Sequence, residues 1–318
     1  MVYMLVFLQN LLNIDMNKVF NLIHYFFTQK TPLIEHYNFF EPTLKRLDFS
    51  DYKLTSEKII LSTYFTSKKD PQRESYTTND DFNYIKKFYE SVIKMDFHAV
   101  IFYDTLSEDF LQKYSCENIK FLKVKLGPYS LNDERYYIYY EFIQTFNPTK
   151  IIMADVNDVV FLKPDVFEYI KNNTLSICKD ETFIYDNRWI QNKIKILPFS
   201  LDRKKYSFWN MPVVNAGVIG GEFTIIKNFL QNLIYLFEKT ENDLNNNMVC
   251  VNIVFHDLYW LSYANSFQFK CSHIFNKNQT KNIANTKGIH IKSFNLGFPF
   301  TTAYKKEEMD SKAYIKHK

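Results

Sequence analysis

Residues 149–162 have the sequence TKIIMADVNDVVFL, a short apolar run followed by acidic and amide side chains. The apolar run 151–153 predicts a strand that is buried on both faces of a sheet. Asp155, Asn157 and Asp158 come directly after it, and open α/β sheets bind ligands at the carboxyl ends of such strands. Their oxygens suit Mg²⁺ or Mn²⁺, and such an ion suits a diphosphate. The same residues are also typical of a turn after a core strand, so both interpretations stay open.

Strand-like and helix-like segments alternate around this run. Before it, strands are expected at 58–65, 98–104 and 118–126. The helices expected between them lie at 80–95, 107–114 and 133–146, the last capped by Asn132 or Asp133. This alternation predicts an α/β fold with a mostly parallel, doubly wound sheet flanked by helices.

The second half of the chain is less regular. Helices are expected at 165–173, 224–238 and 247–263, and late strands at 267–275 and 288–294. The region 175–215, with its Trp and Pro residues, is expected to be an irregular lid or pocket wall. The whole chain is thus divided into an N-terminal helical extension (1–56), a main domain (57–295) and a solvated, Lys-rich tail (296–318).

The composition limits the classes of function. A chain of 318 residues can bury a large core, and its net charge of +4 fits an anionic small substrate without calling for nucleic acid. Six glycines are too few for glycine-rich phosphate loops. The cysteines have no CxxC spacing, which favours buried thiols in a reducing, cytoplasmic compartment; they are Cys116, Cys178, Cys250 and Cys271.

The N-terminal segment is apolar only up to Leu8, and the polar side chains of Asn10, Asn13 and Asp15 interrupt the stretch after it. The apolar run is too short for a spanning helix, and it lacks the basic start and cleavage site of a signal peptide. We expect an amphipathic helix that docks on the domain. Peripheral contact with a membrane surface is the alternative.

Two later segments add polar groups. The segment VVNAGVIGGEF (213–223) holds three of the six glycines. Gly217, Gly220 and Gly221 could allow close backbone approach or positive φ beside a ligand, and Asn215 with backbone amides could bind sugar hydroxyls. Its alternative interpretation is a strand-to-helix turn opened by Gly221 and Glu222. In KGIHIKSF (287–294), His290 could bind a metal and Lys292, on the same face of a strand, could meet a phosphate.

Other candidates come from the strand ends and from one helix. Arg135 could bind a phosphate or carboxylate, or form a surface pair with Asp133 or Glu134. The expected strand ends could hold a nucleoside, and the residues there are Ser62, Thr63, Tyr64 and Asp104.

The order of these motifs along the chain resembles that of GT-A-type glycosyltransferases. The motifs are, in order, the hydroxyl-rich strand end, Asp104, Arg135, Asp-x-Asn-Asp at 155–158, Asn-Ala-Gly-x-x-Gly-Gly at 215–221 and a late histidine. The resemblance covers residues 57–295. It implies a GT-A-like, Rossmann-like sheet with a small mixed C-terminal portion. It also implies a Mn²⁺- or Mg²⁺-dependent, hexosyltransferase-like enzyme that moves a sugar from a UDP- or GDP-sugar to a hydroxyl of a glycan, lipid or protein acceptor.

The resemblance also implies a role for each site residue. Asp155 would face the donor ribose and the metal, and Asp158 and His290 would bind the metal. Arg135 would hold the donor, and the strand-end residues would hold the nucleoside. The chain departs from the family pattern at Asn157, where the second aspartate of Asp-x-Asp is usual. It departs again where some relatives have an acid–glutamine pair and this chain has Asn247 and Met248.

An inverting reaction needs a carboxylate base, for which Asp186, Glu181 and Asp257 are candidates; a retaining reaction needs none. Two rivals remain. A sugar-nucleotide pyrophosphorylase would need a glycine-rich loop after the first strand, where this chain has STYFTSKKD (62–70). The other rival is a non-catalytic protein that binds carbohydrate or nucleotide on the same fold.

Overall fold

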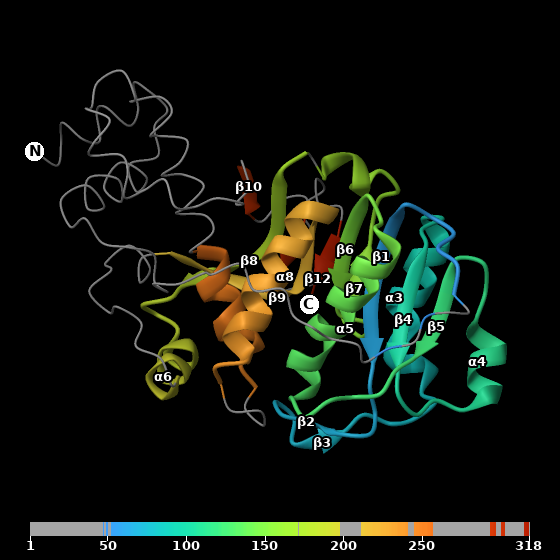
Figure 1. The fold of residues 1–318 in the computed structure, drawn as a ribbon, viewed down its shortest axis with the longest axis horizontal. Helices are drawn as coiled ribbons and strands as arrows, with labels where there is room; N and C mark the ends of the chain where they lie inside the picture. Colours follow the sequence, from blue (N-terminus) through green and yellow to red (C-terminus); the bar gives the residue numbers. More distant parts are fainter. Residues whose placement is uncertain are drawn as a thin grey trace, which may run out of the picture.

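The computed structural model describes residues 47, 49, 52–170, 172–197, 211–240, 245–256, 293–296, 300–302 and 315–317. Its centre is a seven-stranded sheet in the order β10-β8-β9-β6-β1-β4-β5 (Figure 1). The strands of this sheet are β1 (Lys58–Tyr64), β4 (Ala99–Tyr103), β5 (Ile119–Lys123), β6 (Lys150–Ala154), β8 (Thr174–Phe183), β9 (Pro212–Glu222) and β10 (Ser293–Leu296).

The sheet is mixed and mostly parallel. β5, β4, β1 and β6 are parallel neighbours, and β9 runs antiparallel to both β6 and β8. When the four parallel strands are numbered along the chain, their order in space is 3-2-1-4. Connections therefore reverse direction between β1 and β6, which is the switch point where doubly wound sheets bind ligands.

Helices cover both faces of this sheet, which confirms the expected α/β class. The strands alternate between the faces: Ile59 and Leu61 pack into one core and Ile60 into the other. The first core lies under α5 (Leu131–Phe146), α8 (Phe223–Phe237) and the helical residues 247–256. The second lies under α3 (Phe82–Lys94) and α4 (Glu108–Tyr114).

Most expected elements of the parallel half are confirmed within a few residues, and three expectations are wrong. Helix α5 is capped by Ser130, so it begins before the expected cap at Asn132 or Asp133. The helix expected after Pro164 is only a short 3₁₀ helix, η1 (Val166–Tyr169). The region 175–215 is not irregular throughout, because it contains most of β8, the start of β9 and α6 (Arg188–Ile196).

Short strands complete the described structure. β2 (Lys69–Asp70) and β3 (Ser75–Tyr76) form a hairpin after β1. A small mixed sheet joins β7 (Val159–Phe161) to β12 (Ile315–His317) and β11 (Phe300–Thr302). Ile315 is buried, so the segment expected as a solvated tail contributes to the folded body.

Two further expectations concern cysteines and membranes. Cys178 and Cys250 are buried, and Cys116 is partly buried. Among the described residues, every helix is too short or too polar to cross a bilayer. The expected N-terminal helix falls outside the described residues, as do the strand expected at 267–275 and the end of the helix expected at 247–263.

Candidate functional site

The candidate site lies at the carboxyl ends of β1 and β6, the two strands of the switch point. Ser62 is fully buried and its hydroxyl donates to the carbonyl of Ala154, 2.7 Å away, which ties these two ends together. Asp155 is the next residue after β6 and is partly buried. The sheet therefore presents a carboxylate at the edge where a ligand is expected.

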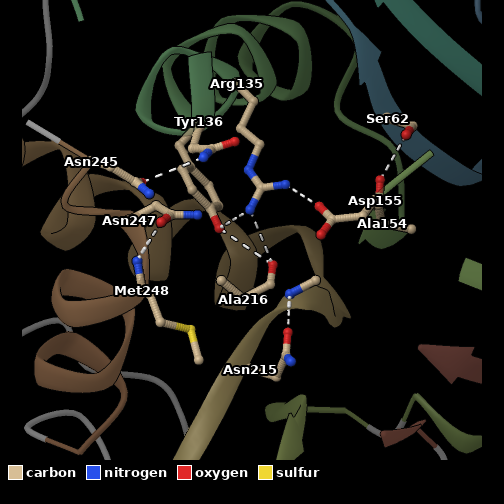
Figure 2. A network of polar contacts seen from close by, with 12 residues as sticks. Ser62, Arg135, Tyr136, Ala154, Asp155, Asn215, Ala216, Asn245, Asn247 and Met248 are labelled. Atoms are coloured by element: carbon tan, nitrogen blue, oxygen red, sulfur yellow. Dashed lines mark hydrogen bonds and ion pairs between the residues drawn. The ribbon is translucent and has the colours of Figure 1, made fainter. Parts of the chain in front are cut away.

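Arg135 reaches this carboxylate from the second turn of α5. Its Nη1 donates to Oδ1 of Asp155, and its Nη2 lies 3.1 Å from the hydroxyl of Tyr136 and 3.4 Å from the carbonyl oxygen of Ala216 (Figure 2). The Arg135 side chain is 9% exposed and that of Asp155 is 27% exposed. The alternative of a surface pair with Asp133 or Glu134 is therefore wrong.

The environment of Arg135 favours its charged form. Burial by itself lowers the pKa of the guanidinium, but Asp155, Tyr136 and Tyr139 together offset that effect, so the pKa is raised. The Nε atom of Arg135 is buried without a hydrogen-bond partner among the described residues. The guanidinium is thus held in place by Asp155, by the carbonyl of Ala216 and by the ring of Tyr136, whose centroid is 4.9 Å from Cζ.

Besides the end of β6 and helix α5, a bulge in β9 contributes to the site. Ile219 pairs with Ile177 of β8, but the next pair joins Asn215 to Cys178, so residues 216–218 have no partner on that side. On the other side, β9 keeps its register with β6 one residue beyond the Ala154–Val218 pair, so the carbonyl of Gly217 accepts from the Asp155 N–H at 2.9 Å. Asn215 Oδ1 accepts from the N–H of Gly217, at 2.7 Å, and so fixes the bulge. Bulges of this kind are frequent beside active sites.

Tyr84 of α3 lies close enough to both aspartates for their charges to affect its pKa. Burial raises the pKa of Tyr84, the guanidinium of Arg73 lowers it, and the carboxylates of Asp155 and Asp158 raise it. The Tyr84 ring stacks on Tyr64, with centroids 5.1 Å apart.

The expected nucleoside contacts are occupied within the protein. Asp104 accepts hydrogen bonds from the backbone N–H groups of Thr66 and Ser67, at 2.9 and 3.0 Å, and so anchors the loop after β1. The Tyr64 hydroxyl donates to the Thr78 carbonyl at 2.6 Å, while Thr63 is partly buried. Their roles towards a nucleoside stay predictions.

Asp133 forms a second buried group beside the site. Its Oδ2 accepts from the backbone N–H of Asn246, 3.3 Å away, and joins the start of α5 to the start of the helix at 247–256. Burial raises the pKa of Asp133 to about 7. Two neighbouring side chains complete this junction: Asn132 donates to Asn245, and Asn247 Oδ1 accepts from the N–H of Met248 (Figure 2).

Of the three glycines in 213–223, one lies at the site and two lie away from it. Gly217 is part of the site, whereas Gly220 and Gly221 pair with Ile152 and Ile151 nearer the opposite end of β6. A Cβ at Gly221 would lie 3.2 Å from the carbonyl oxygen of Thr174, so this glycine permits close packing. Glu222 is the N-cap of α8, which confirms the alternative interpretation of a strand-to-helix turn.

Other candidates lie apart from this network or outside the described residues. Asp186 is exposed, and its backbone N–H donates to the carbonyl of Phe183 in the connection between β8 and α6. His290, Lys292 and Asp257 fall outside the described residues, and the placement of the Glu181 side chain is also outside them.

The chemistry of the two aspartates fits a divalent cation. The described residues contain no group of three acidic, His or Cys side chains around one point. Mg²⁺ is, however, commonly held by one or two carboxylates together with substrate phosphates and water. Asp155 and Asp158, which lie three residues apart in the connection from β6 to β7, can supply that number of carboxylates.

Sequence reasoning misses several parts of the site. The Ala216 carbonyl belongs to the backbone and has no sequence signal of its own. In the sequence, Asp133 is typical only of a helix cap or an ion-pair partner, and Tyr84 belongs to an ordinary helical pattern. The run 245–247 has the composition of a low-complexity segment, although all three side chains are buried.

Comparison of the chain with models of known protein families and with curated protein sequences gave no match.

Proposed function

We propose that this protein is a metal-dependent glycosyltransferase that moves a sugar from a nucleotide-diphosphate sugar to a hydroxyl acceptor. The observation that best supports the proposal is the buried Arg135–Asp155 pair at the switch point between β1 and β6. The bulge of β9 closes the site from the other side. The order of motifs along the chain supports the same class of enzyme.

In this proposal each described group has one task. Asp155 and Asp158 would hold Mn²⁺ or Mg²⁺, which when bound neutralises charge on the diphosphate leaving group. Arg135 keeps the Asp155 carboxylate in one orientation and adds positive charge next to the leaving group. Because glycosyl transfer has an oxocarbenium-like transition state, positive charge near the departing diphosphate favours reaction.

The loop after β1 argues against the pyrophosphorylase alternative. Such an enzyme needs loop N–H groups that can surround phosphates. Here the N–H groups of Thr66 and Ser67 donate to the resident carboxylate of Asp104. The loop amides nearest to β1 are therefore already occupied by an anion of the protein itself.

The direct test is release of UDP or GDP from a panel of nucleotide-sugars, with and without Mn²⁺. We expect metal-dependent release with at least one donor, and a loss of about 100-fold or more in Asp158→Ala. Asp109→Ala, which removes an exposed carboxylate on α4, is the matched control and should leave turnover unchanged. Nucleotide binding without turnover across the whole panel would instead support a non-catalytic binding protein.

Calorimetry separates the metal role from general damage to the site. Asp155→Asn and His290→Ala should each weaken nucleotide binding when Mn²⁺ is present and leave metal-free binding unchanged. Equal losses with and without metal would contradict the proposed metal ligands.

A further inference from the structure

A second feature of the molecule lies on the segment that links β8 to α6. The described residues contain six large hydrophobic side chains that are exposed, and four of them fall between residues 183 and 196. These four are Phe183 (38% exposed), Tyr185 (51%), Trp189 (42%) and Ile196 (54%). Such a local concentration of exposed apolar side chains marks an interaction surface.

Helix α6 packs against the protein through one side and carries Trp189 and Ile196 on another. Ile190 and Ile194, four residues apart, are buried and fix one face of the helix against the protein. Trp189 and Ile196 are seven residues apart, so they lie on one side of the helix, two turns from each other. Asn187 caps the helix by accepting from the N–H of Ile190 at 3.0 Å, which sets its direction.

The aromatic side chains next to the helix are ordered against each other. The rings of Phe183 and Tyr185 are stacked, with centroids 5.6 Å apart and planes at 15°. The Lys193 ammonium lies 5.8 Å from the centre of the Trp189 ring. The segment thus exposes flat aromatic faces together with basic side chains.

The segment carries more basic than acidic side chains. Residues 182–197 contain three basic side chains, Arg188, Lys193 and Lys195, and a single acidic one, Asp186. Arg188 and Lys195 are exposed and, seven residues apart, lie together along one side of the strip formed by Trp189 and Ile196. Aromatic and aliphatic side chains bordered by Lys and Arg are the composition of helices that lie in the interface of an anionic membrane.

We propose that the α6 surface, formed by Phe183, Tyr185, Arg188, Trp189, Lys195 and Ile196, binds an anionic phospholipid bilayer. The aromatic rings and Ile196 enter the level of the headgroups, while the basic side chains contact lipid phosphates. This proposal does not rest on the proposed function.

The position of the surface agrees with its use as a membrane contact. β9 begins at Pro212, five residues before Gly217, so the β8–β9 pair extends beyond the Asp155 edge of the sheet. α6 stands at the periphery of the described structure, beyond β8 and β9 (Figure 1). Of the helices that the structure describes, α6 is therefore placed for approach by a flat bilayer from outside the sheet.

Co-sedimentation of the full chain with vesicles tests the proposal. We expect binding to phosphatidylcholine vesicles that contain about one-third phosphatidylserine, and weak binding to phosphatidylcholine alone. Trp189→Ala combined with Ile196→Ser should lower the partition coefficient by about tenfold or more, because it removes the apolar strip. Lys195→Gln should lower it about fivefold, as expected for one basic side chain near an anionic surface.

Tyr76→Ala is the matched control for the aromatic change. Tyr76 is 59% exposed on the β2–β3 hairpin, and Lys69 lies 6.0 Å from its ring centre, much as Lys193 lies over Trp189. Lys86→Gln on α3 is the control for charge, since the Lys86 side chain is 50% exposed. Both controls should bind vesicles like the wild type.

A spectroscopic readout locates the contact. In a variant with Trp209→Phe and Trp260→Phe, Trp189 is the remaining tryptophan. Its emission should shift to the blue on anionic vesicles and should be quenched by brominated lipid. Absence of binding, or binding that the α6 variants do not weaken, would overturn the proposal. Dimerisation that Trp189→Ala abolishes, without vesicle binding, would assign the surface to a second copy of the chain and overturn it too.

Discussion

The guanidinium of Arg135 and the carboxylate of Asp155 form an ion pair between α5 and the end of β6. The pair is asymmetric, because the Arg135 side chain is 9% exposed while that of Asp155 is 27% exposed. Water can therefore solvate the carboxylate more easily than the guanidinium. The two residues should respond differently when either partner is removed.

Asp155→Ala should lower the free energy of unfolding by about 3 kcal/mol or more, because it leaves a buried guanidinium uncompensated. Arg135→Met should lower it less, since the remaining carboxylate keeps part of its hydration. Urea denaturation of both single variants and of the double variant measures the difference and the coupling. The control Asp109→Ala, on the surface of α4, should change the free energy of unfolding by no more than about 0.5 kcal/mol. Equal losses from the two single variants would contradict the asymmetry.

Asp133 should make the protein less stable as pH rises from about 4 to about 7. Burial raises the pKa of this carboxyl from 3.8 to about 7, so the folded state holds a proton that the unfolded state releases. The free energy of unfolding then falls by up to about 1.4 kcal/mol per pH unit in that range. Asp133→Asn should remove this dependence and raise stability at pH 8. If the urea midpoints of Asp133→Asn and of the wild type change with pH in parallel, this role of Asp133 is contradicted.

The parallel half of the fold is predictable because its signal is local. Buried strands such as 58–64 and 99–103 are apolar runs, and α3 repeats its buried residues Ile85, Phe88 and Val92 at helical spacing. These patterns do not depend on distant contacts. The position of Asp155 is predictable for the same reason, because the carboxyl end of a strand is visible in the sequence.

The partners of Asp155 are not predictable in the same way. Arg135 precedes it by twenty residues, and the two meet only because α5 packs across the sheet before β6 begins. The bulge of β9 depends on register with β8, which a single sequence does not specify. β8 itself escapes prediction because polar residues from Lys179 to Thr182 interrupt its apolar start.

His256 should make the protein less stable as pH falls, whereas Asp133 should make it less stable as pH rises. Burial lowers the pKa of its imidazole to about 3, while its Nε2 lies 3.0 Å from the Pro212 carbonyl oxygen. Because the unfolded state takes up a proton below about pH 6.5, stability should be lost as pH falls from there towards 3. His256→Asn should flatten the acid limb of the stability profile. If the urea midpoints of His256→Asn and of the wild type fall with the same slope between pH 6 and pH 4, the prediction is contradicted.

Gly221→Ala should lower the free energy of unfolding by about 1 kcal/mol, because the added methyl group is crowded and its neighbours must shift to admit it. Its Cβ would lie 3.2 Å from the Thr174 carbonyl oxygen and 3.3 Å from Cδ1 of Ile226. Ile226→Val removes that Cδ1 atom, so the double variant should be more stable than the sum of the two single losses predicts. Nucleotide binding should be unchanged, since Gly221 pairs with Ile151 and not with the Asp155 end of β6. Strictly additive losses in urea denaturation would show that Ile226 does not limit the space at Gly221.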